Sequence, residues 1–178
     1  MSQLVIWPWW LRVCHWLVAI GVVALWLLTY VLHETGELHR FTGYGLITAI
    51  FLRIALSLLI SSATTKLKLP SKQQLRLHLH HLKLRQIPVH YGHNPLGFMA
   101  VYWLWFCISA LAFTGWLSRT DLLWGEDWPV DLHAYLSYLL MASVLLHICA
   151  VFLVSKWSKQ QLLKQMIDGE LHHQQDLI

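Results

Sequence analysis

The chain has 178 residues, of which 57% are hydrophobic and 12% charged, whereas soluble domains average about 45–50% apolar and about 25% charged residues. This apolar content excludes an intrinsically disordered chain. A water-soluble domain of this length also has too small an interior to bury so many apolar side chains. The three cysteines lie scattered within apolar runs, which excludes a secreted disulfide scaffold. The composition therefore predicts an integral membrane protein.

Four apolar stretches are long enough to cross a bilayer, which takes roughly 20 residues in a helix. They predict transmembrane helices at about residues 13–33, 39–62, 95–118 and 132–156, with the longest connection at residues 63–94. None shows the alternating pattern of a strand, and a helix satisfies its own backbone hydrogen bonds in lipid. The predicted fold class is all-α: an integral membrane four-helix bundle that forms one domain over residues 1–178.

Lys and Arg residues flank these spans unevenly. One side of the predicted bundle carries ten of them, in the two termini and in the 63–94 connection, and the other side carries only Arg40 and Arg119. Both termini and the long connection are therefore predicted to be cytoplasmic. Within that connection, residues 72–85 form a basic amphipathic stretch. The opposite side carries six acidic residues against its two cations, a net charge of −4.

Histidines at bilayer depth are costly and indicate a functional site. His15 lies near the cytoplasmic end of the first span, and His39 lies at the outer end of the second. His133 opens the last span at the outer side, and His147 follows 14 residues later, about 21 Å further along the helix. We therefore expect two levels of paired histidines, His15 with His147 inside and His39 with His133 outside.

Paired histidines at two depths are the arrangement that two haems need, because each iron takes two imidazoles. Fourteen residues are two heptads, so His133 and His147 share one edge of their helix, and the same interval separates His39 from Arg53. The sequence contains no CxxCH motif, so any haem would be held without thioether bonds. Iron with two imidazole ligands has no open position, which suits electron transfer. Gly43, four residues after His39, would leave room for a macrocycle.

Two further histidines keep the ligand assignment open. His33, near the outer end of the first span, is an alternative to His39, but it lies about 6 Å beyond the outer level. Contact with a haem propionate would suit His33 better. His93, just before the third span, is an alternative to His15 at the inner level.

A series of short motifs runs along the chain in a fixed order. The motifs are Arg12-Val-Cys-His15-Trp16, Leu38-His39 with Gly43-Tyr44 and Arg53, Gly92-His93-Asn94-Pro95-Leu96-Gly97, Leu132-His133 with its spacing to His147, and Met166-Ile167-Asp168-Gly169. In this order and spacing they resemble the bacterial cytochrome b561 family, which includes the cytochrome b subunits of nickel–iron hydrogenases. The last motif resembles a less basic form of that family's tail. The resemblance covers nearly the whole chain.

The resemblance implies two non-covalent haem b groups that pass electrons across the bacterial inner membrane, between a respiratory-chain quinone and a periplasmic redox partner. The corresponding ligands are His15 with His147 and His39 with His133, and no residue is expected to be catalytic. The quinone would be ubiquinone or menaquinone. An outer net charge of −4 would favour a cationic c-type cytochrome as the partner. No nucleic-acid partner is expected.

Arg53 is the one charged residue deep within a predicted span. Its side chain either extends to the cytoplasmic interface or pairs with a propionate of the inner haem or with a quinone headgroup. A quinone site near the inner haem would include Arg53, His93 and Asn94.

Two other functions remain open. The first is a superoxide:quinone oxidoreductase, which would make the protein an enzyme. Superoxide is an anion, however, and only Arg40, Arg119 and His33 are available to attract it at the outer side. The second is a His-lined ion transporter, although the spans carry almost no other polar residues between the two histidine levels.

Overall fold

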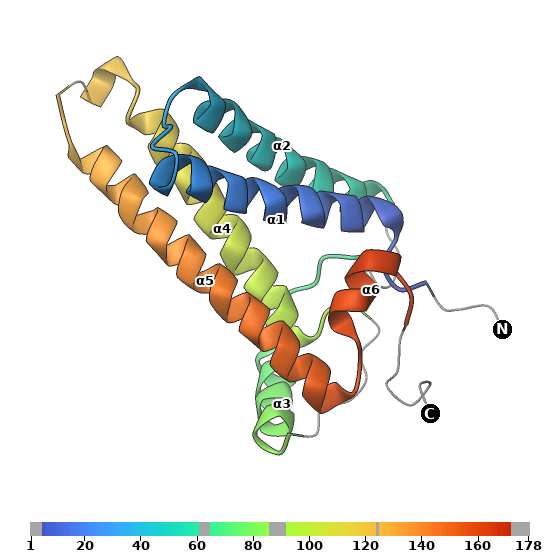
Figure 1. Cartoon of the computed structure of the whole chain (residues 1–178). Coiled ribbons are helices and arrows are strands. Elements are labelled where there is room, and N and C mark those ends of the chain that lie inside the picture. Colours follow the sequence, from blue (N-terminus) through green and yellow to red (C-terminus); the bar gives the residue numbers. More distant parts are fainter. Residues whose placement is uncertain (1–4, 61–64, 86–91, 124, 172–178) are drawn as a thin grey trace. The chain divides into compact units, whose positions relative to one another are not determined.

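The computed structural model describes residues 5–60, 65–85, 92–123 and 125–171. Within these ranges the chain forms six α-helices, a short 3₁₀ turn and no β-strand. Four helices are long and apolar enough to cross a membrane, namely α1 (Trp9–Tyr30), α2 (Glu37–Leu59), α4 (Pro95–Leu117) and α5 (Trp128–Ser158) (Figure 1). The predicted all-α fold with four membrane spans is therefore confirmed for the described residues. Residues 61–64 and 86–91 of the predicted second span and long connection lie outside them.

The helix ends follow local sequence signals rather than hydropathy alone. α1 ends before residue 33 because His33 has a positive φ of 54°, a left-handed conformation that stops a helix. α4 begins after Asn94, whose side-chain oxygen accepts a hydrogen bond from the N–H of Gly97 at 2.7 Å. α5 begins before the predicted residue 132, because the carbonyl of Asp127 accepts two backbone hydrogen bonds of its first turn.

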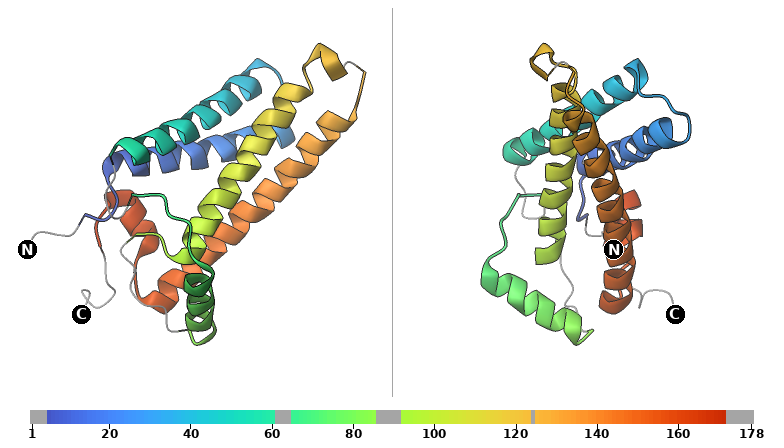
Figure 2. Two further views of the ribbon diagram at one scale, coloured as in Figure 1. Left: turned by 180° about the vertical axis from the view of Figure 1, so that it is seen from behind. Right: turned by 90° about the vertical axis from the view of Figure 1, so that its left-hand side faces the viewer.

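The chain divides into two compact units. One unit comprises Cys14–Ile54 and Trp103–Leu145, and so contains the greater part of all four spans. In this unit α1 lies beside α2, and α4 lies beside α5 (Figures 1 and 2). Its apolar core contains residues that are each at most 6% exposed: Val22, Leu46, Ile50, Cys107, Ile108 and Leu140. All four spans contribute to this core, which holds their facing sides together.

The other unit comprises Met1–Val13, Ala55–Tyr102 and Leu146–Ile178. It contains two shorter helices, α3 (Lys72–Lys83) and α6 (Leu162–Asp168). α3 occupies the predicted basic amphipathic stretch and begins with a capping box, in which Ser71 and Gln74 each bond to the other's backbone N–H. The sequence did not predict α6, because a helix of seven residues gives almost no periodic signal.

The segment after α6 is bonded to the N-terminal segment. The carbonyl of Gly169 accepts hydrogen bonds from the N–H groups of Ile6 at 2.8 Å and Trp7 at 3.1 Å. Arg12 donates a hydrogen bond to the carbonyl of Ile167. Gly169 has a φ of 87°, and a Cβ there would lie 2.6 Å from the carbonyl oxygen of Trp7, so this position requires glycine. The tail motif therefore contacts the chain's own N-terminus.

Candidate functional site

The structure brings together the two histidines that the sequence pairs at the outer level. His39 lies in the first turn of α2, and His133 lies near the start of α5. The centres of the two imidazole rings are 6.1 Å apart, and both side chains are half-buried. Two residues far apart in the sequence thus form a neighbouring pair of possible metal ligands.

A threonine hydroxyl contacts each of these rings. The Oγ1 atoms of Thr29 on α1 and Thr114 on α4 lie 3.1 Å from Nδ1 of His39 and of His133, respectively. Each hydroxyl donates its single hydrogen to the carbonyl four residues earlier in its own helix, at 3.0 Å and 2.9 Å. A hydroxyl that keeps its hydrogen in this bond would accept from the ring, which would place the hydrogen of each histidine on Nδ1. The Nε2 atom of each ring then offers a lone pair.

A glycine lies against the His133 ring, and another follows His39 by one turn of α2. A Cβ on Gly115 would be 3.1 Å from the His133 ring, so this ring packs directly on the backbone of α4. Gly43 follows His39 by one turn, on the face of α2 that also carries the buried Leu46 and Ile50. A Cβ on Gly43 would meet no atom within 4 Å. The surface of α2 at Gly43, one turn after His39, is therefore open.

The predicted inner ligands, His15 and His147, belong to different units. His15 is half-buried in α1, and its ring centre lies 5.5 Å from that of Trp16. His147 is half-buried in α5, 14 residues after His133. His33, the alternative outer ligand, is exposed in the turn that follows α1. Of the candidate outer ligands, it is thus His39, and not His33, whose ring lies close to that of His133.

Arg53 is buried in α2, with only 7% of its surface exposed. It lies close enough to the Cys14 thiol to interact with it electrostatically, and Cys14 directly precedes His15. An arginine keeps its charge inside a protein, and a buried charge is stable only beside a compensating group. This burial favours pairing with an anion over extension of the side chain to the water interface.

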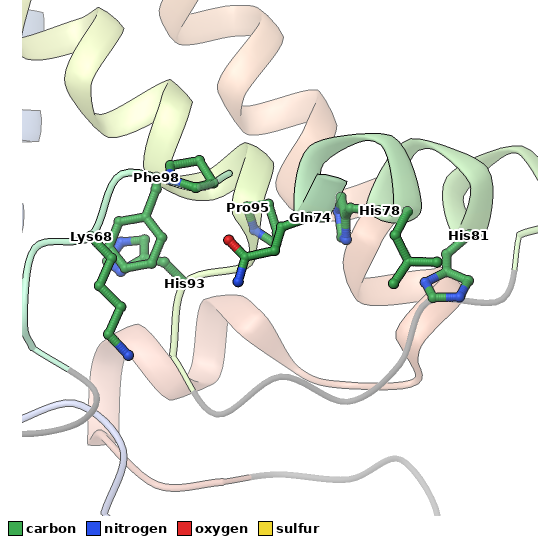
Figure 3. Close-up of a pocket in the computed structure, with 9 residues that line it drawn as sticks. Lys68, Gln74, His78, His81, His93, Pro95 and Phe98 are labelled. Atoms are coloured by element: carbon green, nitrogen blue, oxygen red, sulfur yellow. The ribbon is translucent and has the colours of Figure 1, made fainter. Parts of the chain in front are cut away.

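A cavity of about 450 Å³ lies between α3 and the start of α4 (Figure 3). It is lined by polar and apolar side chains, among them Lys68, Gln74, Leu77, His78, His93 and Phe98. Gln74 and His93 point into this space. The ring of His93 also contacts Trp7, at 4.7 Å between ring centres, and Phe98, at 5.1 Å. Of the three residues predicted for a quinone site, His93 lines this cavity.

Within the part of the chain that the structure describes, no three His, Cys, Asp or Glu side chains are grouped so that they could hold a metal ion. A pair of histidines suffices for haem iron, since the porphyrin supplies the other ligands. His39 and His133 are such a pair.

A family model described as prokaryotic cytochrome b561 matches residues 6–169. The chain belongs to the prokaryotic cytochrome b561 family. This match confirms the resemblance carried by the sequence motifs. With its four apolar helices, the protein is a multi-pass membrane cytochrome of the b type, which binds haem and transfers electrons. The comparison with curated proteins gave no match.

The outer histidine pair of this cytochrome fits a haem iron. Metal–imidazole bonds of about 2.0–2.1 Å place two ring centres on opposite sides of one metal about 6.3 Å apart. The observed separation is 6.1 Å. In addition, histidine ligands commonly donate their second ring N–H to a neighbouring acceptor, and a threonine hydroxyl lies within hydrogen-bond distance of Nδ1 in both rings.

Sequence reasoning missed Thr29, Thr114 and Gly115. A usable signal was present, because all three lie near the outer ends of apolar spans, level with the predicted outer histidines. Polar residues inside a membrane span are uncommon enough to be examined as possible partners of a histidine at the same depth.

Proposed function

We propose that this cytochrome holds two haem b groups and transfers electrons across the bacterial inner membrane, between membrane quinone and a periplasmic carrier. The proximity of His39 and His133, whose ring centres are 6.1 Å apart, is the observation that carries the proposal. His15 and His147 hold the second haem, because His147 follows His133 by two heptads on one edge of α5. When bound, the haems supply reversible one-electron oxidation and reduction of iron. Residues 1–178 act as a single transmembrane domain.

The distribution of charge supports an orientation of the chain in the membrane with both termini in the cytoplasm. Ten Lys and Arg residues flank the side that carries the termini and α3, which we assign to the cytoplasm. The periplasmic side then has a net charge of −4. A cationic c-type cytochrome suits this surface, because opposite charges speed the encounter of two proteins.

Superoxide oxidation coupled to quinone reduction is less well supported. It would need cationic side chains at the periplasmic side to attract the superoxide anion. Arg40, one of the two cations there, forms an ion pair with Glu37, which compensates its charge. Electron transfer to a protein carrier is therefore the better-supported activity.

The electron-transfer function is tested with the purified protein in lipid vesicles that contain quinol, with a cationic c-type cytochrome outside. Quinol should reduce the b-type haems, and the carrier should then be reduced. We expect the rate of carrier reduction to fall at least about tenfold between about 10 mM and 150 mM salt, because the Debye length shortens from about 30 Å to 8 Å. A spectrum without low-spin haem b would contradict the proposal. Rapid haem reduction by superoxide, followed by quinol formation, would instead establish the superoxide reaction.

The cavity beside His93 is the proposed site of the quinone headgroup. Its volume of about 450 Å³ is typical of small-molecule pockets. His93 and Gln74 offer hydrogen bonds to carbonyl oxygens, while Leu77 and Phe98 offer apolar contact to the quinone ring. Two unlike kinds of side chain therefore face the same space, as an amphiphilic headgroup requires.

Replacing His93 by leucine should raise the KM for quinol about tenfold, which corresponds to the loss of one hydrogen bond. The haem content should stay unchanged. Steady-state quinol oxidation and the haem-to-protein ratio measure the two quantities. The matched control is His80→Leu on α3, since His80 is exposed and lies outside the cavity lining. Loss of one haem in the His93 variant would show instead that His93 is an iron ligand.

A further inference from the structure

The two threonines at the outer histidine pair share one geometry. Each is close to the outer end of its helix, donates its hydroxyl hydrogen to its own helix backbone, and lies 3.1 Å from a ligand Nδ1. Thr114 is only 4% exposed, so water does not compete for its oxygen, and Thr29 is half-buried. We propose that Thr29 and Thr114 are positioning residues, which orient the two imidazoles and set the electron density that they give to the outer haem iron.

The inference rests on the proposed ligation of haem by His39 and His133. Rotation of an imidazole about its bond to iron leaves Nε2 in place but moves Nδ1. A hydrogen bond at Nδ1 therefore selects one ring orientation. In the structure the two ring planes are 62° apart. Because the acceptors belong to α1 and α4, the orientation of each ring depends on a helix other than its own.

The hydrogen bond at Nδ1 also affects the redox state. A ring whose N–H donates to an acceptor is a more basic ligand, and it stabilises the ferric iron more than the ferrous iron. A hydroxyl is a neutral acceptor, so its effect is weaker than that of a carboxylate. Removal of either hydroxyl should therefore shift the outer haem toward the reduced form.

The test compares the full-length wild type with Thr29→Val and Thr114→Val, which remove the hydroxyl and nearly conserve the shape. Both variants should retain two haems per chain. At a fixed ambient potential, the ratio of oxidised to reduced outer haem should fall about threefold, a shift of about +28 mV at 59 mV per tenfold change. The electron paramagnetic resonance g values of the ferric outer haem should also change, because they depend on the angle between the imidazole planes.

Serine variants and distant threonines provide the controls. Thr29→Ser and Thr114→Ser keep the hydroxyl, so the potential and the g values should stay near those of the wild type. Thr42→Val and Thr48→Val remove hydroxyls that donate to a carbonyl four residues earlier at 2.8 Å, as Thr29 and Thr114 do. Both residues lie on α2, where Thr42 is half-buried and Thr48 is exposed. Their hydroxyls donate to the carbonyls of Leu38 and Tyr44. Neither control should change the potential or the g values of the outer haem.

Each result supports or overturns the inference. Unchanged potential and g values in the valine variants overturn it, and the proposed function still stands if His39→Ala removes one haem. An effect larger than expected, loss of the outer haem in the valine variant but not in the serine variant, also supports it, because serine keeps the hydroxyl that valine lacks. Loss in both shows that the threonine acts by packing alone, which overturns it. Absence of a haem on His39 and His133 in the wild type overturns the proposed function together with the inference.

Discussion

Replacing His133 by alanine is expected to lower the haem content from about two to about one per chain, because the iron loses one of its two imidazoles. Replacing His39 should remove the same haem, since the centres of the two rings are 6.1 Å apart. The double variant should lose no more than either single one. Haem extraction, with protein determined separately, measures the ratio, and a reduced-minus-oxidised spectrum shows which haem remains.

Two further variants make this result specific. His33→Ala should retain both haems, because His33 is exposed in the turn after α1. His133→Met should retain the outer haem at a higher potential, since a thioether is an iron ligand that favours the reduced state. If His33→Ala lost a haem and His39→Ala kept both, the outer ligand would be His33. His15→Ala and His147→Ala should each remove the inner haem by the same reasoning.

Replacing Arg53 by leucine is expected to lower the midpoint potential of the inner haem. Arg53 is 7% exposed and lies near Cys14, the residue before the proposed ligand His15. A buried cation stabilises the added electron of the reduced haem. At a distance of about 10 Å from the iron, loss of the Arg53 charge should shift the midpoint potential by on the order of 50–100 mV, for an effective dielectric constant of about 20. A redox titration that resolves both haems measures the shift.

The controls for Arg53 separate its charge from its shape. Arg53→Lys keeps the charge, so the midpoint potential of the inner haem should stay near that of the wild type. Arg40→Gln removes a cation that is already paired with Glu37 at the other end of α2, and it should leave the inner haem unchanged. An Arg53→Leu variant with a normal potential but a raised KM for quinol would mean that the arginine binds the quinone headgroup rather than a propionate.

Much of the architecture could be read from the amino acids in order. Four apolar runs identified α1, α2, α4 and α5, because the thickness of the bilayer sets a minimum length for any helix that crosses it. The interval of 14 residues between His133 and His147 placed both on one edge of α5, since helical geometry is periodic. Regular spacing also marked Gly43 as a neighbour of His39. These inferences depend on distances within one helix, which the sequence specifies directly.

The contacts between helices required the folded chain. Thr29 and His39 are ten residues apart, and Thr114 and His133 are nineteen apart, and both pairs meet across a turn between two helices. The burial of Arg53, the cavity beside His93 and the bonding of Gly169 to the N-terminal segment depend in the same way on which side chains meet. Apolar length and helical period are independent of how helices pack. The ring tautomers and the space beside a ligand arise only when side chains from different helices come within hydrogen-bond distance.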